Sequence, residues 1–105
     1  MWQVEVHPLV WEEDFARLDP QARLRITKAI RRKLTTHPTE FGTPFSGPLH
    51  GYWRLRVDDY RVVYRMEQQR LLVIVVKVGM RRDAQVYTDA IPRLRKLGLL
   101  SSWTP

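Results

Sequence analysis

The strongest constraint on the fold is a strict alternation of residue types between Trp53 and Asp58. Trp53, Leu55 and Val57 are apolar, and the residues between them are charged. Side chains two positions apart share one face of a β-strand, so this segment predicts a strand with an apolar face toward a core and a basic face away from it. Asp58 and Asp59 follow, and aspartates are typical of a tight turn.

A two-residue turn at these aspartates predicts how the strand pairs with the next one. Apolar residues then lie opposite each other on the buried face: Val57 opposite Tyr60, Leu55 opposite Val62, and Trp53 opposite Tyr64. On the other face Arg56 lies opposite Arg61, and like charges in this position destabilise a sheet. We expect an acidic group to neutralise the pair, and it could belong to a phosphate, to a partner protein or to a nearby carboxylate of this chain. The simpler alternative is a solvated face with Asp58 or Asp59 as counter-ion.

Charge and length limit the function classes. The chain has 105 residues, which suffices for one domain with a modest two-layer core. Its net charge of +7 favours an acidic partner such as nucleic acid. Residues 50–105 carry eleven Lys/Arg and five Asp/Glu, against seven and six in residues 1–49, so the basic excess lies in the half with the hairpin.

The chain contains no cysteine, which excludes disulfides, a thiolate nucleophile and cysteine-based zinc sites. The longest mainly apolar run, Leu71–Val78, is far shorter than the roughly 20 residues of a membrane helix. The first ten residues lack the basic start and apolar run of a signal peptide. We therefore expect a cytoplasmic protein that does not enter a membrane.

The rest of the chain predicts further elements by its periodicity. Residues 2–7 alternate like a strand, and residues 9–18 and 21–34 have apolar residues at helical spacing. Asp19 and Pro20 are typical of a helix start. Trp2, Trp11, Tyr60 and Tyr64 are expected in the core. The other side of the second helix is basic and carries Arg25, Lys28, Arg31 and Arg32. This side is either solvated or binds RNA phosphate without sequence preference.

Residues 35–49 contain several prolines and glycines and predict a loop. Strands are expected at about 52–58, 60–67 and 70–78, the last of them central because it is apolar on both faces. A short helix is expected between residues 84 and 97. The order β-α-α-β-β-β-α predicts an α+β domain. In it, a twisted, mainly antiparallel sheet of about four strands is covered on one face by a helical hairpin, and its other face is partly open.

Motifs from the end of this loop onward carry a specific resemblance. They are, in order, Gly47-Pro48-Leu49-His50-Gly51-Tyr52, Trp53-Arg54-Leu55-Arg56, Asp59-Tyr60-Arg61-Val62-Val63-Tyr64, Val76-Lys77-Val78-Gly79-Met80-Arg81-Arg82 and Val86-Tyr87. In this order and spacing they resemble RelE-type toxins of bacterial type II toxin–antitoxin systems, in the RelE/ParE superfamily. The resemblance implies one RelE-like domain over residues 1–105.

RelE-like toxins enter the ribosomal A site and cleave mRNA there by attack of a 2′-hydroxyl on the adjacent phosphate, without a metal or other cofactor. The resemblance thus implies an mRNA interferase, a metal-independent endoribonuclease that inhibits translation. It implies that Arg61 stabilises the transition-state phosphate, Arg81 assists the leaving oxygen and Tyr87 is the general base. The residues that it implies for RNA binding are Arg54, Arg56, Lys77 and Arg82.

One position departs from the family pattern, which has two lysines flanking one residue of the strand before the hairpin. Tyr52 and Arg54 stand there, and only Arg54 keeps the charge. A tyrosine is a poor base at its ordinary pKa of about 10. Nearby arginines favour the phenolate and lower that pKa, so a mechanism with Tyr87 as base depends on the arginine cluster.

Two other functions remain open from the sequence. A ParE-like toxin shares the fold and an arginine like Arg61 but inhibits DNA gyrase, and a degenerate toxin would only bind its antitoxin or nucleic acid. All three readings imply a cognate antitoxin, an acidic and partly disordered chain that folds on binding, and operator DNA only for the toxin–antitoxin complex. That chain is expected to shield the Arg56 and Arg61 pair or to displace the helix with Tyr87.

Overall fold

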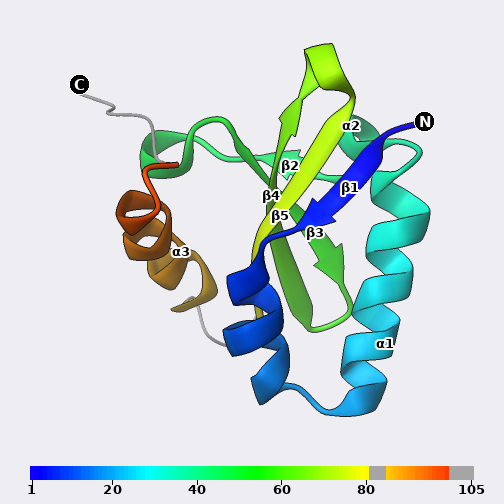
Figure 1. Cartoon of the computed structure of the whole chain (residues 1–105), viewed down its shortest axis with the longest axis vertical. Helices are drawn as coiled ribbons and strands as arrows, with labels where there is room; N and C mark the ends of the chain where they lie inside the picture. Colours follow the sequence, from blue (N-terminus) through cyan, green and yellow to red (C-terminus); the bar gives the residue numbers. More distant parts are fainter. Residues whose placement is uncertain (81–84, 100–105) are drawn as a thin grey trace.

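The computed structural model describes residues 1–80 and 85–99. Five strands form one sheet in the order β1-β5-β4-β3-β2, with helices on both faces (Figure 1). The strands are β1 (Gln3–Val6), β2 (Thr43–Pro44), β3 (Tyr52–Val57), β4 (Tyr60–Glu67) and β5 (Leu72–Met80). The helices are α1 (Pro20–Ala29), α2 (Pro38–Phe41) and α3 (Gln85–Lys96), with short helical turns η1 (Val10–Asp14), η2 (Phe15–Arg17), η3 (Ile30–Leu34), η4 (Gly47–Leu49) and η5 (Gln68–Arg70).

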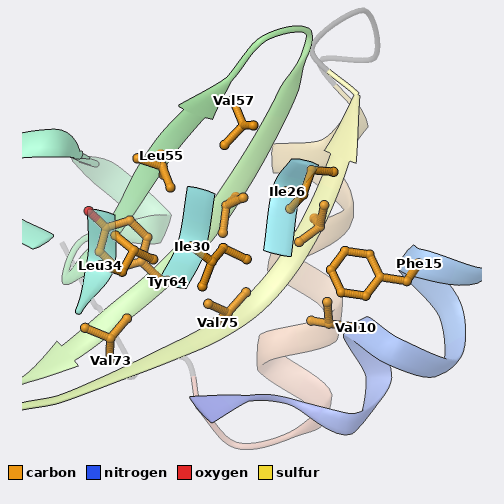
Figure 2. Close-up of a cluster of buried hydrophobic side chains, with 12 residues drawn as sticks. Val10, Phe15, Ile26, Ile30, Leu34, Leu55, Val57, Tyr64, Val73 and Val75 are labelled. Carbon is orange, nitrogen blue, oxygen red and sulfur yellow. The ribbon is translucent and has the colours of Figure 1, made fainter. Parts of the chain in front are cut away.

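The predicted helical hairpin is confirmed. Asp19 caps α1 by accepting the Ala22 N–H at 2.7 Å, and Pro20 occupies the first helical position. The helix continues through η3, and its buried side chains repeat every four residues as Ala22, Ile26, Ile30 and Leu34. Figure 2 shows the last three packed against side chains from β3, β4 and β5. This apolar stripe covers one face of the sheet.

The β3–β4 hairpin has the predicted register. Val57 pairs with Tyr60, Arg56 with Arg61, and Leu55 with Val62. Asp58 has a φ of 51°, the left-handed conformation that a two-residue hairpin turn requires. The third predicted strand, β5, lies inside the sheet between β1, to which it is parallel, and β4. The hairpin and β5 could be predicted because their signals, alternation and an apolar run, lie within a few consecutive residues.

Three predictions need correction, and the first two concern the loop and Trp11. The expected loop at residues 35–49 contains α2, η4 and a fifth strand, β2, which pairs with the edge of β3. Two residues, one of them a proline, carry no periodic signal, so this edge strand was missed. Trp11 is 51% exposed rather than in the core, and its ring packs edge-to-face on Phe15 with centroids 4.8 Å apart.

The second face of the sheet is less open than the sequence suggested, because α3 lies on it (Figure 1). The two faces hold separate clusters of buried residues, and that under α3 consists of Leu49, Tyr52, Val63, Val76, Ala90 and Leu94. Gly79 permits this packing, since a Cβ there would lie 2.7 Å from Cγ2 of Val86. No helix in residues 1–80 and 85–99 is long and apolar enough to cross a membrane.

Candidate functional site

Three arginines gather at the β3–β4 hairpin. Arg56 and Arg61 are direct partners across the two strands, and Arg54 lies two residues before Arg56 on the same face. Arg54 and Arg56 are exposed, whereas Arg61 is only 7% exposed. Nη1 of Arg61 donates to the carbonyl oxygens of Asp58 at 3.0 Å and Tyr60 at 2.8 Å. The turn itself therefore anchors one end of this guanidinium group.

These arginines have no acidic partner in the part of the chain that the structure describes. Asp58 pairs instead with Arg25 of α1, at 3.8 Å between Oδ2 and Nη1. Among residues 1–80 and 85–99, no carboxylate lies within ion-pair distance of Arg54, Arg56 or Arg61. A buried cation without a counter-ion is costly, so this face favours binding of an anion.

Tyr87 lies in the first turn of α3 and is half-buried. Its ring packs edge-to-face against Phe45 with centroids 5.3 Å apart. The guanidinium carbon of Arg54 lies 5.9 Å from the centroid of that same Phe45 ring. Phe45 therefore joins the phenol of α3 to the arginines of the hairpin.

Sequence reasoning missed Phe45, which follows the short strand β2. Its N–H donates to the carbonyl oxygen of Tyr52 at 2.9 Å, and this bond holds the loop beside the edge of β3. The available signal was an aromatic residue inside a segment rich in proline and glycine. An aromatic side chain in such a segment is expected to pack against another part of the fold. The sequence does not show which part, because the partner, Tyr87, is 42 positions away.

Lys77, expected to bind RNA, is not brought to the arginines. It is buried, and its Nζ lies 3.0 Å from Oδ1 of Asp14 in η1. The Asp14 carboxylate also accepts the Val78 N–H at 2.9 Å. It accepts two further hydrogen bonds from Arg93 of α3, from Nη1 at 2.8 Å and from Nη2 at 3.0 Å. Lys77 thus belongs to an ion-pair network at the edge of β5. The expected site residues Arg81 and Arg82 lie outside the described residues.

Tyr52, where the family pattern has a lysine, is buried beneath α3. Its hydroxyl donates to the carbonyl oxygen of Leu99. Burial raises the pKa of this phenol, while the nearby Arg65 guanidinium partly opposes the rise. Tyr52 therefore fastens the segment after α3. The described residues contain no cluster of three or more His, Asp or Glu side chains arranged to hold a metal ion.

The profile of a family described as "ParE toxin of type II toxin-antitoxin system, parDE" matches residues 4–85, most of the chain. The chain belongs to this family. A curated relative, the mRNA interferase toxin RelE of Escherichia coli K12, is 37% identical over 41 residues, which are 39% of this toxin and 43% of the relative. The toxin thus matches less than half the length of that relative.

Solved structures of RelE proteins share the fold of this toxin. The toxin–antitoxin complex RelBE2 of Mycobacterium tuberculosis matches with a TM-score of 0.73 and 23% identity, over 78% of this chain and 93% of the other. Isolated E. coli RelE matches with a TM-score of 0.63 and 19% identity, over 90% of this chain and 99% of the other. The archaeal RelE–RelB complex of Pyrococcus horikoshii matches with a TM-score of 0.60 and 24% identity, over 79% of this chain and 98% of the other. The toxin is therefore a member of the RelE/ParE superfamily with a RelE-like fold.

Proposed function

We propose that this toxin is a ribosome-dependent endoribonuclease that cleaves mRNA in the A site and thereby inhibits translation. The observation that carries the proposal is Arg61, a nearly buried guanidinium with no carboxylate partner among the described residues. Arg54 and Arg56 extend the same basic face, and Tyr87 reaches it through Phe45. The curated relative's name, mRNA interferase toxin, supports the same activity.

The chemistry needs a group that holds the phosphate as its charge develops. Arg61 uses Nη1 for the turn carbonyls, and its Nε and Nη2 have no partner in the described part of the chain. These two N–H groups form the edge of the guanidinium that binds two phosphate oxygens at once. Because the turn holds the group in place, little reorganisation is required when the pentavalent phosphorane forms.

The reaction forms a bond between the 2′-oxygen and phosphorus and breaks the bond between phosphorus and the 5′-oxygen. Tyr87, or a water molecule, takes the proton of the 2′-hydroxyl. By the family resemblance, Arg81 assists the leaving 5′-oxygen, which takes a proton from Arg81 or, where Arg81 only neutralises its charge, from water. Arg54, Arg56 and Arg82 hold neighbouring phosphates, and the products are a 2′,3′-cyclic phosphate and a 5′-hydroxyl. No step requires a cofactor.

We also propose a cognate antitoxin as partner. The solved relatives from M. tuberculosis and P. horikoshii are toxin–antitoxin complexes. The face around Arg56 and Arg61 has a surplus of positive charge, which suits an acidic chain that folds on binding. Such a chain blocks RNA if it covers these arginines. The free toxin is then expected to cleave mRNA faster than the complex.

A second candidate function is inhibition of DNA gyrase, which the match to the ParE profile favours. It would require the same fold but no chemistry at Arg61 or Tyr87. Supercoiling by purified gyrase in the presence of the toxin tests it directly. Inhibition of supercoiling without any RNA cleavage would replace the first proposal with this one.

The deciding experiment is mRNA cleavage on programmed ribosomes by the wild type, Arg61→Ala and Tyr87→Phe. Arg70→Ala is a matched control, because Arg70 is exposed at the β4–β5 turn, at the other end of β4 from Arg61. We expect cleavage in the A site by the wild type and the control. We expect a loss of about 100-fold or more in Arg61→Ala, and Tyr87→Phe measures the contribution of the hydroxyl. A folded wild type that cuts nothing contradicts the proposal.

A further inference from the structure

A second basic feature lies outside the candidate site, between the helical hairpin and the outer edge of β3. It is a groove of about 580 Å³, bordered on one side by α1 and η3 and on the other by Arg56, Val57 and Asp58. Six cationic side chains line it: Arg25, Lys28, Arg31, Arg32, Lys33 and Arg56. Asp58 is the one carboxylate among the described residues that line it.

Most of this charge is uncompensated. Arg25 and Asp58 form an exposed pair at 3.8 Å, which contributes little at such a distance. Lys33 lies over the Phe41 ring, 5.6 Å from its centroid. Lys28, Arg31 and Arg32 have no ion pair within residues 1–80 and 85–99. The groove therefore has a strong positive potential, which suits a polyanion.

Arg56 connects the groove to the candidate site. It lines the groove and is also the cross-strand partner of Arg61. The outer edge of β3 is open here, because β2 pairs only with Trp53 and Arg54. A chain bound at Arg54 and Arg61 can thus pass over the edge at Arg56 and enter the groove without crossing another strand of the described structure.

The lining distinguishes an RNA strand from a docked protein helix. A helix that binds in a groove needs apolar anchors, and the large exposed apolar residues Trp11, Leu24 and Phe41 do not line this groove. Its apolar lining is limited to Ala29, Val57 and the aliphatic stems of the cationic side chains. Cations without apolar anchors favour the sugar–phosphate backbone, which Lys and Arg bind by neutralising its phosphates.

We propose that this groove binds the phosphate backbone of the substrate RNA where the strand continues beyond the cleaved phosphodiester. The inference rests on the proposed function, since it takes the strand held at Arg61 as its starting point. It assigns to Lys28 and Arg32, one helical turn apart, the contacts with phosphates outside the cleaved dinucleotide.

The test uses the full-length toxin and RNA that cannot be cleaved because its 2′-hydroxyls are methylated. Fluorescence anisotropy compares a trinucleotide with an RNA of about ten nucleotides, at salt concentrations from about 0.05 to 0.2 M. The variant is Lys28→Gln with Arg32→Gln. The control is Arg23→Gln with Arg70→Gln, which removes the same charge from exposed positions that do not line the groove. Circular dichroism confirms that both proteins are folded.

We expect the longer RNA to bind the wild type more tightly than the trinucleotide. The groove variant should lose about tenfold in affinity for the longer RNA, and its salt slope should fall by about 1.4, the value for two phosphate contacts with a single strand. Its affinity for the trinucleotide and both affinities of the control should stay within about twofold. Equal binding of the two RNAs by the wild type, or equal losses in variant and control, overturns the proposal.

Two further arms separate the other occupants. If the variant binds a glutamate-rich peptide more weakly but both RNAs normally, the groove is a protein-docking site. If it binds free RNA normally but ribosomes more weakly, the groove contacts ribosomal RNA. Either result overturns the proposal. Because the RNA is not cleaved, a failed cleavage assay with a positive binding result removes the proposed nuclease activity alone.

Discussion

Asp14 and Arg93 are 79 positions apart, yet their side chains form two hydrogen bonds of 2.8 and 3.0 Å inside the fold. Arg93 also donates to the carbonyl oxygen of Val76 at 3.3 Å. The same carboxylate accepts the N–H of Val78, on the edge of β5 that β1 does not reach. One buried carboxylate therefore joins η1, β5 and α3, the helix that carries Tyr87.

Arg93→Gln is expected to lower the free energy of unfolding by about 3 kcal/mol, since it leaves Asp14 paired with Lys77 alone and opens buried space. Urea denaturation measures the change. Arg95→Gln is the control, because Arg95 is exposed on the same helix and its loss should cost less than about 0.5 kcal/mol. Equal effects of the two changes would show that the network does not hold α3.

Gly79→Ala is expected to displace the first turn of α3, because the new Cβ would lie 2.7 Å from Cγ2 and 2.9 Å from Cβ of Val86. We expect a loss of about 1–3 kcal/mol in the free energy of unfolding, as for other overpacked contacts. Adding Val86→Ala removes the nearer atom and should recover part of the loss. A double-mutant cycle without coupling between these positions would contradict the packing that the structure shows.

Tyr64 makes the stability of the folded protein depend on pH in the alkaline range. Its hydroxyl is fully buried and donates to the carbonyl oxygen of Pro38 at 2.6 Å, and burial raises its pKa far above the ordinary 10.0. The folded state therefore keeps the neutral phenol, whereas the unfolded chain ionises above about pH 10. The resulting stabilisation is complete below that pH and is lost as the pH rises.

Tyr64→Phe removes this dependence. The variant should lose about 1–2 kcal/mol at neutral pH, because the Pro38 carbonyl is left without its partner. Its further loss between about pH 9 and 11 should be smaller than that of the wild type. Urea denaturation at several pH values measures both effects, and parallel pH profiles would contradict the assignment.

Arg56→Gln is expected to stabilise the free toxin while weakening its function. The change removes the like-charge pair with Arg61 and should raise the free energy of unfolding by about 0.2–1 kcal/mol. It should also weaken RNA binding, because Arg56 borders both the basic face and the groove. A variant that is both less stable and fully active would show that the repulsion is relieved within the protein itself.

Much of the fold was readable from the chain alone because its signals are local. The alternation from Trp53 to Val57, the turn at Asp58 and the helix start at Asp19 depend on residues a few positions apart, and the structure confirms them. The same pattern placed Arg54, Arg56 and Arg61 on one face. What local patterns could not show was how deeply each arginine is buried, because burial depends on what the rest of the chain places over it.

The sequence by itself determined the hairpin register, the helical hairpin and the basic face, since each follows from a period of two or from helical spacing. Only the tertiary structure decided that Lys77 turns toward Asp14, that Phe45 meets Tyr87 and that Arg56 borders a groove with α1. These contacts join residues far apart in the chain, and they exist only because helices on both faces of the sheet bring them together.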